Sequence, residues 1–287
     1  IHIPSNVKKI GMMAFSSCEN VTEITIENGV ESIGDRAFEW NKATEITIPE
    51  SVRAIGSEII GETLIETVYY NAIQLDKNLS RSPITKLPVF SNGSLKKIVF
   101  GEKVKLVPGL CSYNSTTLEE IVFSNSIEEI DFGAFWGCTA LKTFTLPNSL
   151  KLIDMYAFAD CTAIESLVIP DGVEEIKSVA FRNCTALAEI TIPQSIKVIN
   201  TKAFDGCTGV KILNFNAVNV KYGSTTETEI GDVYYSPFRT MTALETINIG
   251  SNVKEICDYA FCGVEGPVKV NLPANVTDIG KCAFAFS

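Results

Sequence analysis

The sequence has few of the side chains on which most enzyme chemistry depends. Histidine occurs once in 287 residues, as His2, which leaves little material for an imidazole-assisted nucleophile or a histidine-rich metal site. No G-x-S-x-G, P-loop, H-E-x-x-H or G-x-G-x-x-G motif is present. Adjacent acids such as Glu128-Glu129 recur at one repeat position, and neighbours in an extended chain point to opposite faces. We therefore expect no enzyme, no catalytic residue, no metal and no cofactor.

Long hydrophobic runs and basic clusters are also missing. The longest apolar stretches are a few residues, whereas a membrane helix needs about 20, so we expect no membrane span. The 24 basic and 34 acidic residues give a net charge of −10, which argues against nucleic acid and anionic bilayers as partners. The opening residues Ile1-His2-Ile3-Pro4 show neither the basic n-region nor the apolar h-region of a secretory signal, and neither end carries a polar cap. We expect a fragment whose terminal caps and flanking sequence are missing.

A repeat of 23 residues runs through the chain. The dipeptide Ala-Phe recurs within the unit I-x-I-P-x-S-V-x-x-I-G-x-x-A-F-x-x-C-x-x-L-x-E. About twelve units begin at Ile1, Ile24, Ile46, Val68, Ile98, Ile121, Phe144, Leu167, Ile190, Leu213, Ile247 and Val270.

Each unit changes its pattern once. Residues 187–193 alternate apolar and polar around β-branched side chains, which predicts a short strand that ends at Pro193. A second short strand is expected at 196–199. Cys207 stands four residues after Ala203 and three after Phe204, and this spacing suggests one helical turn. One coil is too small to fold alone, so the units should stack as a solenoid.

This spacing of Ile, Pro, A-F and Cys resembles the BspA-like subclass of leucine-rich repeats, found in surface proteins of gut and oral bacteria and of some mucosal protozoa. The resemblance implies an α/β repeat solenoid, a right-handed superhelix with a parallel sheet on its concave face. We expect one solenoid over residues 1–287, with about 12 coils, short helical turns and second short strands. Long irregular repeats occupy 68–97 and 213–246.

Two columns of side chains have structural interpretations. Five cysteines share one repeat position and are expected to pack inward as small apolar groups, namely Cys18, Cys138, Cys161, Cys184 and Cys207. Cys111, Cys257, Cys262 and Cys282 lie off this column, and a disulfide between Cys262 and Cys282 stays open. A second column alternates in sign, which suits pairing between neighbouring coils: Lys8, Glu31, Arg53, Lys105, Glu128, Lys151, Glu174 and Lys197.

The outward position of the first strand is mostly short, neutral and β-favouring. It includes Thr25, Thr47 and Thr191, which we take as candidate binding residues. The composition also fits plain β-propensity, and the sequence does not separate the two explanations.

The two long units match each other and hold five of the eight tyrosines: Tyr69, Tyr70, Tyr222, Tyr234 and Tyr235. Tyrosine is enriched at interfaces, which makes these residues binding candidates; covering the core where the repeat is interrupted is the alternative. Phe90 and Phe238 are expected to restore the repeat after each insert.

The family resemblance implies adhesion to host matrix, to mucosal glycoproteins or to other cells. We expect a non-enzymatic recognition module, secreted or at the cell surface, whose partner is a protein or glycoprotein. An architectural spacer and a glycan-binding accessory module are the alternatives.

Overall fold

The computed structural model describes residues 1–76, 87–200, 202–222 and 236–285. Two compact units divide the chain, Ile1–Ser149 and Leu150–Ser287. Each is a solenoid of parallel strands, and the chain makes about 11 turns because twelve repeat starts enclose eleven full periods. A single solenoid over the whole chain stays a prediction.

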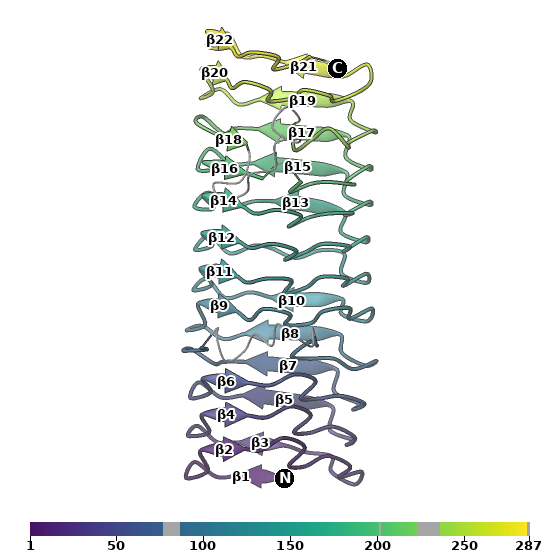
Figure 1. Ribbon diagram of the computed structural model, residues 1–287. Coiled ribbons are helices and arrows are strands. Elements are labelled where there is room, and N and C mark those ends of the chain that lie inside the picture. Colours follow the sequence, from purple (N-terminus) through teal and green to yellow (C-terminus); the bar gives the residue numbers. More distant parts are fainter. Residues whose placement is uncertain (77–86, 201, 223–235, 286–287) are drawn as a thin grey trace. The chain divides into compact units, whose positions relative to one another are not determined.

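The first strand of each turn forms one row of parallel strands in each unit (Figure 1). In the first unit, β5, β7, β8 and β10 form one sheet, and β1 pairs with β3. In the second unit, five such strands form one sheet. The strands of the first unit are β1 (His2–Ile3), β3 (Thr25–Ile26), β5 (Glu45–Ile48), β7 (Thr67–Tyr70), β8 (Lys97–Phe100) and β10 (Glu120–Val122). Those of the second are β13 (Ser166–Val168), β15 (Glu189–Ile192), β17 (Ile212–Phe215), β19 (Thr246–Ile249) and β21 (Lys269–Asn271).

The second short strands predicted from the sequence are also present, and they form a separate row in each unit. In the first unit, β4 pairs with β2 and β6, and β11 pairs with β9. The strands are β2 (Lys9–Ile10), β4 (Ser32–Ile33), β6 (Ala54–Ile55), β9 (Leu106–Val107) and β11 (Glu129–Ile130). Those of the second unit are β12 (Leu152–Ile153), β14 (Glu175–Ile176), β16 (Val198–Ile199), β18 (Lys221–Tyr222), β20 (Glu255–Ile256) and β22 (Asp278–Ile279).

The alternation of the sequence determines which side of each strand is buried. In β5, Ile46 and Ile48 are buried, whereas Glu45 and Thr47 are exposed. Successive residues of a strand point to opposite faces, so every I-x-I segment places two isoleucines inside the coil and one residue on the outer sheet face. The serine after the strand then links neighbouring turns: Ser51 Oγ donates to the carbonyl of Val30 on the preceding turn at 2.6 Å.

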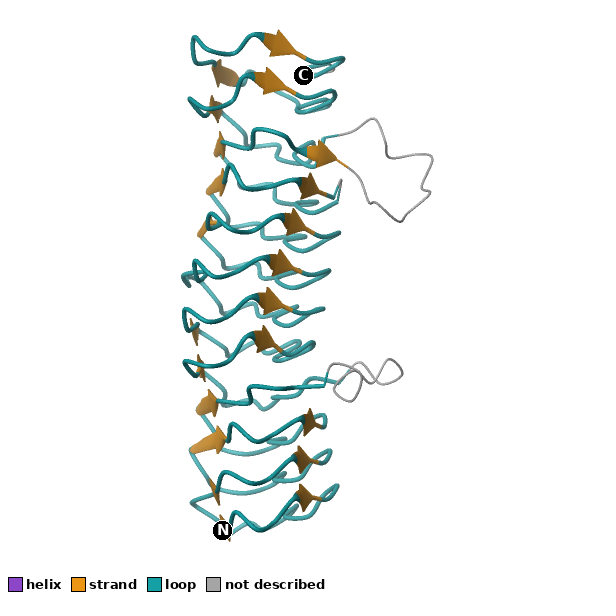
Figure 2. Ribbon diagram, turned by 90° about the vertical axis from the view of Figure 1, so that its left-hand side faces the viewer, coloured by secondary structure: helices purple, strands orange, loops and turns teal. Residues whose placement is uncertain are grey.

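The predicted helical turn around Ala203, Phe204 and Cys207 is wrong. The part of the chain that the structure describes contains strands, turns and loops and no helix (Figure 2). The α/β assignment is corrected accordingly to a parallel β-solenoid. No helix able to cross a bilayer is found among the described residues.

Left-handed residues explain why the equivalent segment of the preceding turn, around Phe181, is not helical. Val179 and Asn183 have φ values of 54° and 57°, and they stand on either side of Phe181. The Phe181 amide donates to the carbonyl of Ala203 on the next turn at 2.9 Å, and the Asn183 amide donates to that of Asp205 at 2.8 Å. Alternate amides therefore bond between coils, whereas a helix would direct them four residues back along its own chain.

The Ala-Phe dipeptides build an aromatic column in the core. Phe181 stacks between Phe158 and Phe204, with ring centroids 5.5 and 5.4 Å apart. Phe238, which follows the second long unit, stacks on Phe204 at 5.9 Å and on Phe261 at 6.0 Å. The prediction that Phe238 restores the repeat is confirmed. These rings are fully buried, and each contributes about 1.5–3 kcal/mol of transfer free energy.

The cysteine column packs inward, as predicted, for four of its five members. Cys138, Cys161, Cys184 and Cys207 have no exposed surface, whereas Cys18 is half-buried. The Cys207 thiol donates to the carbonyl of Phe181 at 3.1 Å, which satisfies a polar group of the preceding coil. All nine cysteines are free, so Cys262 and Cys282 form no disulfide.

The alternating charges pair between neighbouring turns. Lys105 lies 2.9 Å from Glu128 in the first unit, and Lys197 lies 2.9 Å from Glu174 in the second. Both lysines are largely exposed, so each pair adds only about 0–1 kcal/mol.

Candidate binding surface

The strand face of the first unit consists of the outward residues of β1, β3, β5, β7, β8 and β10. His2 lies opposite Thr25, and Thr47 lies opposite Tyr69, which is followed in register by Val99 and Val122. Thr25 and Thr47 are exposed, and Tyr69 keeps 38% of its surface. The pairing places Thr47 and Tyr69 side by side on one flat surface.

The strand face of the second unit has a different chemistry. Val168, Thr191, Asn214, Asn248 and Asn271 follow one another in register along β13, β15, β17, β19 and β21. The three asparagines stack: Asn271 Nδ2 donates to Asn248 Oδ1 at 2.7 Å, and Asn248 Nδ2 donates to Asn214 Oδ1 at 2.8 Å. This asparagine ladder fixes the amide planes along the sheet.

The ladder ends on β15. Asn214 Nδ2 donates to Glu189 Oε1 at 2.7 Å and to Thr191 Oγ1 at 3.2 Å. Each amide has two N–H groups and two acceptor lone pairs, so the ladder contacts leave Asn248 and Asn271 further hydrogen-bonding capacity toward solvent. Asparagine at one phase of three successive units was the sequence signal for this feature, and we did not select those residues as binding candidates.

The five tyrosines of the long units do not form one surface. Tyr69 is on the strand face, but Tyr70 points inward and is completely buried between Phe90 and Phe100, with ring centroids 6.1 and 5.6 Å away. The prediction that Tyr70 contacts a partner is therefore wrong. Tyr70 pairs in register with Ile48, so the alternation along β7 directs it into the core. Burial raises the pKa of Tyr70, so the hydroxyl stays neutral.

Tyr222, on β18, covers the core. Its ring meets Phe238 edge-on at 6.4 Å, and its hydroxyl is buried. Burial and the neighbouring Cys257 thiol raise the pKa of Tyr222. Tyr222 is partly exposed, but its hydroxyl is buried and so cannot contact a partner. Tyr234 and Tyr235 lie outside the described residues.

The long units also share a close contact between an asparagine and a glycine, just after the first strand of the turn. A Cβ on Gly101 would lie 2.1 Å from Asn71 Oδ1, and a Cβ on Gly250 would lie 2.3 Å from Asn216 Oδ1. These glycines occupy the repeat position where proline is usual. The asparagine of each long unit therefore requires glycine on the following coil.

Comparison with known proteins agrees with this architecture. A family model described as a BspA type leucine rich repeat region matches in six copies, at residues 1–118, 84–211 and 228–287. A leucine-rich repeat protein from Bacteroides ovatus is 24% identical over 100% of this chain and 70% of its own, with a TM-score of 0.55. At this identity the likeness concerns the fold alone.

Two further solved structures are more distant. A leucine rich cell surface protein from Faecalibacterium prausnitzii is 23% identical over 81% of this chain and 61% of its own, with a TM-score of 0.36. The pneumococcal vaccine antigen PcpA is 18% identical over 88% of this chain and 74% of its own, with a TM-score of 0.44. No curated protein matches the chain. Because the repeat model covers well over half of the sequence, the chain belongs to the BspA-type leucine-rich-repeat family.

Proposed function

We propose that the chain is a non-enzymatic recognition module at the cell surface, which binds a protein or glycoprotein of host matrix, mucosa or another cell. Membership of the BspA-type family supports the repeat-module part of this proposal. We infer the surface location and the adhesive role from that membership and from the strand faces.

The observation that carries the proposal is the pre-formed strand face in each unit. Thr25, Thr47 and Tyr69 in the first unit, and Thr191 in the second, point outward from sheets whose inner side is fully packed. A rigid sheet loses little conformational entropy when a partner docks, so many modest contacts add up to useful affinity.

The chemistry of these faces suits a polar partner without strong charge. The first face carries the hydroxyls of Thr25, Thr47 and Tyr69, beside His2, Val99 and Val122, and the asparagine ladder supplies fixed amides on the second. Hydroxyl and amide groups both donate and accept hydrogen bonds, so they match peptide groups and sugar hydroxyls equally well.

Binding of the protein to immobilised collagen, fibronectin, laminin and mucin, together with a glycan array, tests the proposal. We expect saturable binding to at least one of the proteins or glycoproteins. Thr47→Arg and Asn248→Arg place a large charge on each strand face and should weaken that binding by about tenfold or more where the face is used.

Matched controls put the same charge elsewhere on exposed positions, with Thr22→Arg in the first unit and Ser251→Arg in the second. Controls that lose binding as strongly as the face variants would contradict a role for the strand faces. Absence of binding to all of these proteins would favour an architectural spacer, and binding to free glycans alone would favour an accessory module.

A further inference from the structure

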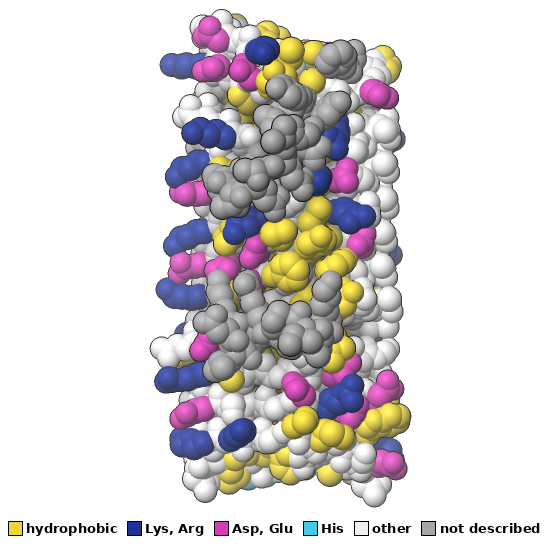
Figure 3. Space-filling model, viewed as in Figure 1, with side chains coloured by type: hydrophobic (Ala, Val, Ile, Leu, Met, Phe, Trp, Pro, Cys, Tyr) yellow, Lys and Arg dark blue, Asp and Glu magenta, His cyan; other side chains and the backbone are white. Residues whose placement is uncertain are grey.

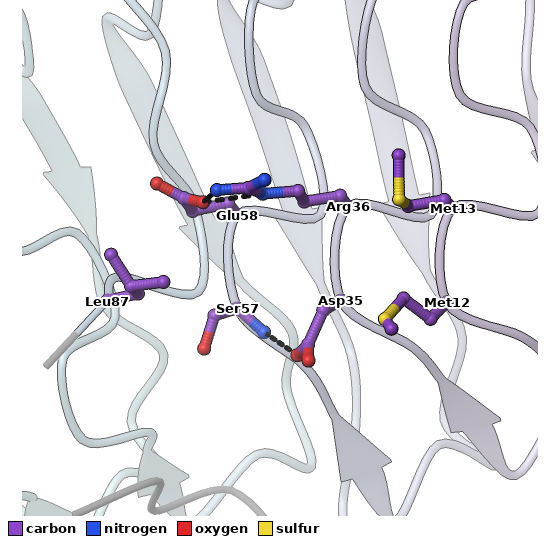
Figure 4. A pocket seen from close by; sticks show the side chains of 7 residues that line it. All are labelled: Met12, Met13, Asp35, Arg36, Ser57, Glu58 and Leu87. Atoms are coloured by element: carbon purple, nitrogen blue, oxygen red, sulfur yellow. Dashed lines mark hydrogen bonds and ion pairs between the residues drawn. The ribbon is translucent and has the colours of Figure 1, made fainter. Parts of the chain in front are cut away.

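A small cavity opens on the side of the first unit, away from the strand face. Its volume is about 210 Å³, and its lining comes from successive turns: Met12, Met13, Asp35, Arg36, Ser57, Glu58 and Leu87. Figure 4 shows these side chains in two parallel rows, with the guanidinium of Arg36 pointing toward Glu58. Pockets for small molecules usually measure about 300–1,000 Å³, so this one has the size for a side chain of a larger partner.

The charges around the cavity are unbalanced. Arg36 Nε and Nη2 lie 2.9 and 2.8 Å from Glu58 Oε2, so the one cation lining the cavity is already paired. The hydrogen bond to Glu58 raises the pKa of Arg36, and the nearby Glu39 and Asp35 carboxylates add to this effect. Three carboxylates therefore surround one guanidinium and leave a local excess of two negative charges.

The two carboxylates that cause this excess keep capacity for a partner. Asp35 Oδ1 accepts the Ser57 amide at 2.8 Å, and Glu39 Oε2 accepts the Ser16 hydroxyl at 3.3 Å. Among the described residues no contact involves Asp35 Oδ2 or Glu39 Oε1 as a hydrogen-bond acceptor. Either oxygen is available to a donor from outside.

An apolar rim accompanies these charges. Met12 and Met13 are 65% and 51% exposed, and Trp40, on the same turn as Arg36, is 50% exposed. Figure 3 shows hydrophobic side chains interspersed with acidic and basic ones around the N-terminal turns. Methionine and tryptophan are adaptable contact residues, and exposed groups of this size commonly mark interaction surfaces.

We propose that this cavity receives a lysine or arginine side chain of a partner protein, with an adjacent apolar residue of that partner packed on Met12 and Met13. The inference rests on the proposed recognition function and names a chemical class of partner for a second surface of the module. Charge complementarity supports it, because the Asp35 carboxylate in the cavity lining can pair with the incoming cation while Arg36 stays on Glu58, and Glu39 near Arg36 adds negative charge. An anionic partner would be repelled by the same excess.

Fluorescence anisotropy with two labelled peptides tests this inference. The probes are Gly-Leu-Lys-Leu-Lys-Gly and Gly-Leu-Glu-Leu-Glu-Gly, added to the intact protein. We expect the lysine peptide to bind and the glutamate peptide not to bind, and the affinity for lysine should fall as salt screens the charges. Asp35→Asn with Glu39→Gln keeps both hydrogen-bond acceptors and removes both charges, and should weaken binding about five- to tenfold.

The control variant, Glu102→Gln with Glu119→Gln, removes two exposed carboxylates of the same unit outside the cavity and should bind like the parent. A second variant, Met12→Gln with Met13→Asn, should weaken binding through the apolar rim; asparagine tolerates the φ of 55° at position 13. Circular dichroism establishes that each variant is folded.

Equal binding by the parent and by the Asp35, Glu39 variant would overturn the inference, as would absence of binding to the lysine peptide. Binding to matrix proteins without binding to the peptides would support the proposed function and overturn this site. Binding to the lysine peptide that depends on Asp35 and Glu39, without binding to any matrix protein, would support the site and overturn the adhesive role.

Discussion

Replacing Gly101 by alanine should destabilise the first unit through a single clash. The new Cβ would lie 2.1 Å from Asn71 Oδ1 and 3.1 Å from its Cγ, whereas ordinary van der Waals contact begins near 3.4 Å. The atoms must therefore separate by more than 1 Å. Gly101 is not in the left-handed region, so the effect is one of space and not of backbone strain.

The expected cost follows from the packing around this corner. The backbone N–H of Asn71 donates to the carbonyl of Ile48 at 2.9 Å, and that of Gly101 donates to the carbonyl of Tyr70 at 2.9 Å. Because these bonds hold both backbones in place, the Asn71 side chain must move. Overpacking of this kind costs about 1–3 kcal/mol. For a protein of this size that corresponds to a fall in Tm of roughly 5 °C.

A double-mutant cycle isolates the contact. Gly101→Ala, Asn71→Ala and the double variant are unfolded in urea and by heat. The double variant should recover most of the loss, leaving a coupling free energy of about 1–2 kcal/mol. Gly93→Ala is the matched control, because a Cβ at that position meets nothing within 4 Å, and it should change stability by less than about 0.5 kcal/mol.

Two results would refute the reasoning. An unchanged Tm in Gly101→Ala would mean that Asn71 turns aside without cost. A double variant as unstable as the single would place the cost in the backbone and not in the asparagine. Gly250 and Asn216 in the second unit provide an independent repeat of the cycle.

Three further predictions concern buried polar groups. Tyr70→Phe should raise the free energy of unfolding by about 1 kcal/mol in urea titrations, because the Tyr70 hydroxyl has no hydrogen-bond partner among the described residues; a loss would reveal one. The free energy of unfolding should fall as pH rises above about 9. The Cys207 thiol and burial raise the pKa of Cys184, so the unfolded chain releases a proton that the folded chain keeps. A Tm that stays constant up to pH 10.5 would contradict this. Ellman's reagent should react rapidly with the exposed Cys282 and reach Cys184 and Cys207 only on unfolding; fast labelling of Cys207 in the native protein would disprove its packing role.

The repeat was readable because each buried position recurs at a fixed phase. The spacing of Ala203 and Phe204 predicted the column into which Phe238 fits, and the alternation of sign predicted the pairing of Lys105 with Glu128. Tyr70 could also have been assigned correctly, since it stands two residues after Val68, at the inward phase of Ile48. We misread it because its residue type suggested an interface.

The turns could not be read in the same way. An apolar spacing of three and four residues fits a helical turn as well as a turn built from two left-handed residues, and Val179 is a residue type that rarely takes positive φ. The Phe181 and Asn183 amides that follow it bond to the next coil, and no local sequence pattern displays such bonds.

The sequence by itself determined the repeat length, the order of strands and corners, and the family, because these depend on which positions exclude water along one chain. The tertiary structure decided which polar groups meet. Asn214 lies 34 residues from Asn248 and 25 residues from Glu189 in the sequence, and only stacking brings these side chains together. Arg36 likewise pairs with Glu58 on the next turn, 22 residues along the chain. Hydrogen bonds and ion pairs between coils depend on the register of the stack, and the asparagine ladder and the acidic cavity are consequences of that register.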